Sequence, residues 1–167
     1  MRRHRASWLK GEEGFSLLEV MIAVVILAVG LLGMSGMQTI ALVKNVDANE
    51  LARITLLASD MMERIQFNRR NAISYNGIDT LSSTNCSAIT APTQSQAKGD
   101  CLLWGSLVNG TQLESIQGKV TVSNVIAPTI LNQRTVTVTV TWTGSARSDV
   151  SVKRPRSLTL NRVVAPE

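Results

Sequence analysis

Apolar residues follow one another without interruption over a long stretch near the start of the chain. Residues 1–14 are polar and basic, and from Phe15 to Val43 only Glu19 carries a charge. The residues from Phe15 to Met37 would form about 34 Å of helix, which is enough to cross the apolar core of a bilayer. The pattern predicts a helix over 15–43 that spans a membrane.

Beyond Val43 the apolar residues are restricted to one side of the predicted helix. They recur at alternating spacings of three and four residues, while charged residues fall largely on the other side. No proline or glycine occurs between Gly36 and Gly77, so we expect this amphipathic half, over 44–71, to continue the membrane helix. The apolar stripe consists of Leu51, Ile54, Ala58, Met61 and Ile65.

The remaining residues, 72–167, predict a globular head. Residues 72–100 are rich in polar residues and read as a loop, and helical spacing then predicts a short helix before Asn109-Gly110. From there apolar and polar residues alternate with a period of two, which indicates an antiparallel sheet with one buried face. The alternating segments are Val120–Val122, Thr135–Thr143 and Leu158–Arg162. With the stripe of the helix covering that face, the predicted fold class is α+β.

Charge and cysteine content narrow the function classes. The net charge is +5, and without residues 1–14 it would be 13 basic minus 10 acidic residues, or +3, too mild an excess to indicate a nucleic-acid partner. Cys86 and Cys101 would be free thiols in the cytosol, whereas in the periplasm we expect a disulfide worth ~3 kcal/mol. The single histidine, His4, provides neither a metal site nor a catalytic triad, and we expect no enzyme activity and no cofactor.

The basic residues before the apolar run predict the orientation of the chain. The positive-inside rule leaves residues 1–14 in the cytoplasm and places the head beyond Val43 in the periplasm. A plain signal anchor would show the same topology. A secretory signal peptide would instead have a shorter apolar region followed by a small-residue cleavage site.

The residues at the start of the apolar run form a more specific motif. Gly14-Phe15, followed by Glu19 and preceded by a short basic segment, resembles the processing site of type IV prepilins. This resemblance implies cleavage between Gly14 and Phe15 by prepilin peptidase, N-methylation of Phe15, and a type IV pilin fold. It also implies that Glu19 acts in assembly with other minor and major pilins at the inner membrane.

A charge at Glu19 needs a physical reason, because an acidic residue within a membrane helix costs roughly 2.5–3.5 kcal/mol at the bilayer centre. The new amino terminus at Phe15, with an ordinary pKa of about 8, stays largely cationic at neutral pH. Glu19 can pair with that ammonium group on a neighbouring subunit when helices pack in a filament. A mismatched stagger would leave both charges unpaired, so the pair can set the register.

Further resemblance narrows the family. Two segments of the helix look like parts of PilV-type minor pilins. They are Ala28-Val29-Gly30-Leu31-Leu32-Gly33 and Ala58-Ser59-Asp60-Met61-Met62-Glu63-Arg64-Ile65. The likeness covers about 14–70 well and the head loosely. It implies a low-abundance subunit that primes type IV pilus assembly. Minor pseudopilins of type II secretion share the N-terminal part and are the near alternative.

Three features have competing interpretations. Gly30, Gly33 and Gly36 favour either close helix packing or a segment that unwinds on assembly. Asp60, Glu63 and Arg64 predict a solvated face with intrahelical pairs rather than an assembly contact. The basic segment Arg147–Arg156 could bind DNA or an anionic surface. It lacks interleaved aromatics, so a solvated strand connection is favoured, and Trp104 and Trp142 are expected in the core.

Overall fold

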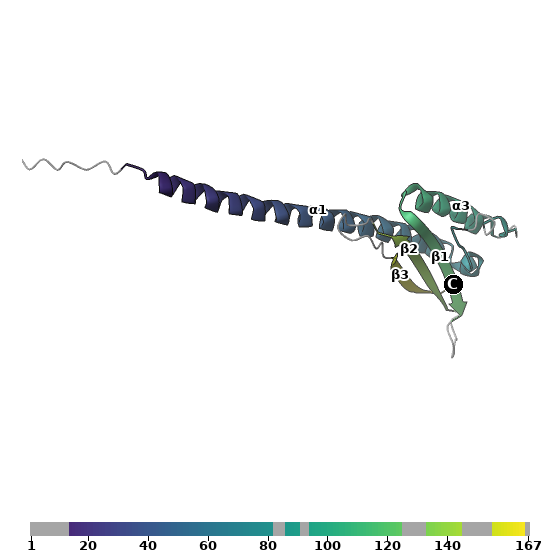
Figure 1. Cartoon of the computed structure of the whole chain (residues 1–167). Coiled ribbons are helices and arrows are strands. Elements are labelled where there is room, and N and C mark those ends of the chain that lie inside the picture. Colours follow the sequence, from purple (N-terminus) through teal and green to yellow (C-terminus); the bar gives the residue numbers. More distant parts are fainter. Residues whose placement is uncertain (1–13, 82–85, 91–93, 125–132, 145–154, 166–167) are drawn as a thin grey trace, which may run out of the picture. The chain divides into compact units, whose positions relative to one another are not determined.

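The fold combines one long helix with a small sheet. The computed structural model describes residues 14–81, 86–90, 94–124, 133–144 and 155–165. Its elements are α1 (Leu17–Phe67), the 3-10 helix η1 (Arg69–Tyr75), α3 (Ser95–Gly110), β1 (Glu114–Asn124), β2 (Arg134–Thr143) and β3 (Pro155–Val164) (Figure 1). The predicted α+β class is confirmed, with the helix packed against a three-stranded antiparallel sheet.

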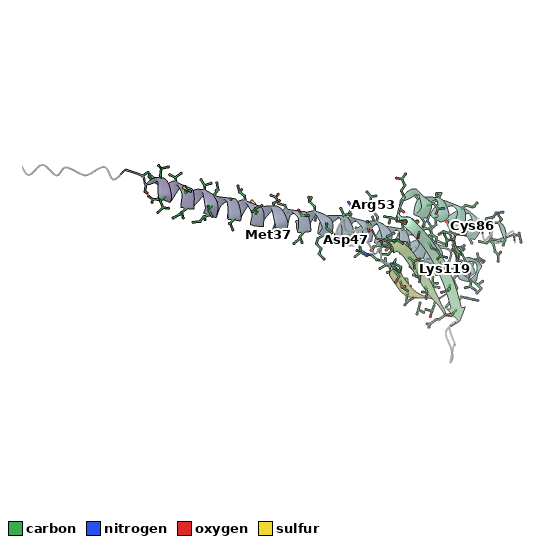
Figure 2. The ribbon with its side chains drawn as sticks, in the orientation of Figure 1. Met37, Asp47, Arg53, Cys86 and Lys119 are labelled. Carbon is green, nitrogen blue, oxygen red and sulfur yellow. A yellow bond between two sulfur atoms is a disulfide. The ribbon has the colours of Figure 1, made fainter. Side chains whose placement is uncertain are left out.

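The chain divides into two compact units, Met1–Leu42 and Val43–Glu167. The first contains the apolar half of α1, in which the side chains are exposed on all sides (Figure 2). The second contains the rest of α1 and the whole head. The predicted change at Val43 from a uniformly apolar to a one-sided pattern therefore falls at the boundary between the units.

The sheet has the order β1-β2-β3 with antiparallel neighbours. β2 alternates strictly, with its valines and Trp142 buried and its threonines half-buried on the other face. This is the pattern that the sequence predicts, because side chains of a strand point alternately to its two faces. β2 and β3 pair without a register shift from Arg134↔Val164 to Thr143↔Pro155.

The core lies between the inward face of the sheet and one stripe of α1. Ile54, Ala58, Met61 and Ile65 are buried as the spacing predicts. Leu51 is an exception: the stripe predicts it as buried, but it is 48% exposed. It lies at the open end of the core, where it lines a shallow hollow together with Asp47, Ala48, Trp142, Arg156 and Ser157.

α1 ends at Phe67, four residues earlier than the sequence predicts. Asn68 is buried and its side chain donates a hydrogen bond to the Tyr75 hydroxyl at 3.1 Å. The Asn71 side chain in turn donates to Asn68 Oδ1 at 3.1 Å, and Asn71 has non-helical angles of φ −110° and ψ 26°. Asparagine side chains offer such local alternatives to helical bonding, so the chain turns into η1 here.

A polar cluster ties the ends of three helices together. Arg64 on α1 bonds to Asp60 at 2.8 Å and to Asp100 on α3 at 3.1 Å. Asp100 also accepts a hydrogen bond from the Tyr75 hydroxyl of η1 at 2.6 Å. Because charge-assisted hydrogen bonds are the stronger ones, this cluster fixes α3 against the end of α1.

α3 is held by a covalent bond and by one large side chain. A disulfide joins Cys86 to Cys101, whose Cα atoms lie 5.6 Å apart. One turn further along α3, the fully buried Trp104 donates a hydrogen bond to the Leu57 carbonyl oxygen at 2.8 Å. Its ring lies against Gly118 of β1, where a Cβ atom would meet Trp104 Cζ3 at 2.7 Å. Only glycine leaves room for the ring there.

Gly118→Ala is expected to destabilise the head by about 1–3 kcal/mol, because the buried and hydrogen-bonded ring of Trp104 has no space to retreat. Urea unfolding of the full chain in detergent, followed by tryptophan fluorescence, measures the change. Gly105→Ala on α3 is the matched control, since nothing lies within 4 Å of its added Cβ. Equal stability of the two variants would contradict this account of the packing.

We expect the folded head to become less stable at alkaline pH because of Tyr75. Its burial, with the hydrogen bond to Asp100, raises the pKa of Tyr75 above its ordinary value. Above pH about 10 the unfolded chain therefore loses this proton while the folded chain keeps it. The free energy of unfolding should fall by up to about 1.4 kcal/mol per pH unit on this account. Tyr75→Phe should remove this component, as unfolding at a series of pH values can measure.

The same prediction has a direct optical readout, because Tyr75 is the single tyrosine of the chain. Tyrosinate absorbance should appear only when the folded chain unfolds, and not as a separate earlier step. Ionisation near pH 10 in the folded protein would show that the Tyr75–Asp100 contact does not hold the proton.

Candidate functional site

The predicted processing site lies in a non-helical segment directly before α1. Gly14, Phe15 and Ser16 have no regular structure, and Phe15 is 79% exposed. Ser16 caps the helix: its hydroxyl accepts a hydrogen bond from the Leu18 N–H at 3.3 Å, and its carbonyl accepts one from the Glu19 N–H at 3.0 Å. The peptide bond after Gly14 therefore lies outside the helix, between two exposed residues.

Glu19 lies in the first turn of α1. A carboxylate is favoured there by the partial positive charge at a helix N-terminus. Its side chain is exposed, and no hydrogen bond or ion pair joins it to another residue in the described ranges. It is four residues from Phe15, or about 6 Å along a helix. Glu19 is therefore available to a charged partner from outside the chain.

One face of α1 beside Glu19 has a shallow apolar hollow. Glu19 lines a shallow surface hollow with Ser16, Leu18, Ile22, Ala23 and Ile26. The positions 19, 22, 23 and 26 lie on one side of a helix because their spacings are three and four residues.

The apolar part of α1 has the length and composition of a membrane span. Its large side chains from Leu17 to Leu42 are exposed, so within the described residues they have no core to pack against. An added Cβ atom at Gly30, Gly33 or Gly36 would meet nothing within 4 Å. No contact inside the described chain accounts for these glycines, and the two interpretations of them both concern neighbours outside it.

Arg64, Trp104 and Trp142, which the sequence analysis singled out, make contacts within the folded chain. Arg64 pairs with Asp60 within α1, as predicted, but it also reaches Asp100 on α3. Trp104 and Trp142 are buried, as predicted. Among the described residues no group of three histidines, cysteines or acidic residues could hold a metal ion.

Most of the basic segment 147–156 lies outside the described residues. Its last member, Arg156, is described, and its guanidinium bonds to Asp47 on α1 at 3.2 Å. This pair joins residues 109 positions apart, and the Asp100 contacts likewise cross between elements. Neither was predicted, because periodicity identifies the face on which a residue lies but not its partner on a distant element.

Comparison with known proteins identifies the N-terminal segment. Residues 9–35 match the family described as "Prokaryotic N-terminal methylation motif". No curated protein and no solved structure matches the chain. The match includes Gly14, Phe15 and Glu19 and does not extend to the head. The chain therefore carries a prokaryotic N-terminal methylation motif, which supports a type IV pilin-like protein that is processed as a prepilin and assembles with other pilins.

Proposed function

We propose that the protein is a minor pilin that is cut between Gly14 and Phe15, methylated on Phe15, and used to prime type IV pilus assembly. The observation that carries the proposal is the combination of an exposed Gly14-Phe15 bond, an exposed Glu19, and the methylation motif over 9–35. Cleavage ahead of the apolar run would leave that run as the start of the mature protein. The head would lie in the periplasm until the subunit enters the filament.

The proposed assembly contact is an ion pair between subunits. The Glu19 carboxylate would meet the terminal ammonium group of Phe15 on a neighbour, while the hollow beside Glu19 receives apolar side chains. Inside a bundle of apolar helices, an ion pair is favourable only when both charges find their partners. The pair would therefore set the stagger between neighbouring helices.

A minor pseudopilin of a type II secretion system is the second candidate, because the N-terminal motif would be the same. The segments 28–33 and 58–65 favour the minor pilin. Deletion of the gene separates the two: loss of surface pili with normal secretion supports the minor pilin, and the reverse result supports the pseudopilin. A subunit that binds DNA through the head is a more distant candidate.

Gly14→Glu is expected to block processing, because the peptidase requires a small residue before the cut. A blot of membranes should show only the full-length chain, whereas the wild type loses its first fourteen residues. Gly99→Glu, an exposed glycine on α3, serves as a control and should be processed normally. Mass spectrometry of the mature wild-type N-terminus should identify methylated Phe15, and any other N-terminal residue would overturn the proposed cleavage site.

Glu19→Ala should be inserted and cleaved normally but should enter pili poorly, by about tenfold or more if the lost contact exceeds about 1.4 kcal/mol. Quantitative blotting of sheared pili against membrane fractions measures this ratio. Glu63→Ala is the matched control, since Glu63 is exposed on the second half of α1. Normal incorporation of Glu19→Ala would contradict the role of the ion pair in register.

A further inference from the structure

The two edges of the sheet differ in whether another described segment pairs with them. Residues 77–80 run along the outer edge of β1: the Gly77 N–H donates to the Val120 oxygen at 3.0 Å, and the Val120 N–H donates to the Ile78 oxygen at 2.9 Å. Among the described residues, β3 is paired only with β2 (Figure 1). β3 therefore presents a row of backbone donors and acceptors on the side away from β2.

The edge of β3 is long and regular. All ten residues from Pro155 to Val164 pair with β2 without a bulge. Soluble proteins usually protect such an edge by shortening, bulging or covering the strand, or by placing proline and inward-facing charge on it. Pro155 is at the first position and leaves every later N–H in place, so the charged residues of β3 decide what can pair with it.

The core-side face of β3 carries a symmetric pattern of residues. Leu158 and Leu160 pack against the core but remain half-buried, and arginines flank them at 156 and 162. Arg156 reaches Asp47 with one nitrogen and is itself 38% exposed. Arg162 is exposed, and its side chain makes no hydrogen bond or ion pair with another described residue. From 156 to 162 the face thus has a cation, two apolar residues and a second cation at alternate positions, and buried Val164 follows them.

We propose that this edge binds an extended segment of a partner protein, which adds to the sheet as a further strand beside β3. The segment would carry an acidic, two apolar and a second acidic residue at alternate positions. Backbone hydrogen bonds would supply affinity, and side chains opposite the leucines and arginines would supply specificity. Directly opposed side chains lie about 4.5–5.5 Å apart, close enough for both kinds of contact.

Charge opposes one register in which a second copy of the chain could pair with this edge. Two β3 strands paired antiparallel with Leu158 opposite Leu160 would also set Arg156 opposite Arg162, and like charges directly opposed are destabilising. The arginines disfavour a basic strand and favour an acidic one, so they select a partner as well as protect the edge. The inference depends on the fold of the head and not on processing or filament assembly.

The test uses the full chain in detergent micelles and a labelled synthetic peptide, Thr-Glu-Thr-Val-Thr-Val-Thr-Glu-Thr. Fluorescence anisotropy should show saturable binding that weakens with salt, and the peptide should slow amide hydrogen exchange in β3. A peptide with both glutamates replaced by lysine should bind at least about fivefold more weakly, since each opposed charge pair is worth up to about 1 kcal/mol.

Arg162→Glu should weaken binding of the glutamate peptide by about fivefold or more. A peptide with one glutamate and one lysine should restore it in one of its two orders, and that order also reveals the strand direction. Arg70→Glu makes the same charge change at an exposed residue of η1, which contacts β1, and should bind as the wild type does.

Three outcomes would overturn the proposal. The first is the absence of saturable binding. The second is an equal loss in Arg162→Glu and Arg70→Glu, which would indicate attraction by overall charge. The third is slow exchange, without peptide, of the β3 amides that point away from β2. If this slow exchange is independent of protein concentration, the chain itself covers the edge, and if it increases with concentration, a second copy does.

Discussion

The head depends on the burial of one stripe of α1 against the inward face of the sheet. Ile54, Met61 and Ile65 are fully buried there, and β2 contributes three buried valines opposite them. Each fully buried side chain of this size is worth roughly 1.5–3 kcal/mol. This burial of only one side explains why the residue pattern of α1 changes from uniformly apolar to amphipathic at Val43. The same helix therefore serves as a membrane-length segment in one half and as the centre of a core in the other.

Polar contacts determine how the other elements attach to this helix. Asp100 joins α3 to α1 and η1, while the disulfide holds Cys101 beside it. Trp104 adds a hydrogen bond to the helix backbone and fills the space above Gly118. Because these contacts are short and mutually dependent, they position α3 more sharply than its apolar face could do alone.

The two surfaces proposed for partners differ in chemistry. The start of α1 offers one carboxylate among apolar side chains, which suits a helix with a single positive charge. The edge of β3 offers backbone groups flanked by arginines, which suits an extended acidic strand. A subunit with both could contact a filament through its helix and a different protein through its head.

The sequence by itself determined the periodic features: the membrane-length run, the stripe of α1, the short helix and the alternation of the three strands. It also determined the methylation motif, since Gly14, Phe15 and Glu19 are close in sequence. Periodicity follows from local backbone geometry, so it can be read along the chain. The tertiary structure alone decided the end of α1 at Phe67, the exposure of Leu51 and the partners of Asp100 and Arg156. It also decided that β3 pairs, among the described residues, with β2 alone. These features depend on which distant segments contact each other, and the spacing of residues along one sequence does not predict such contacts.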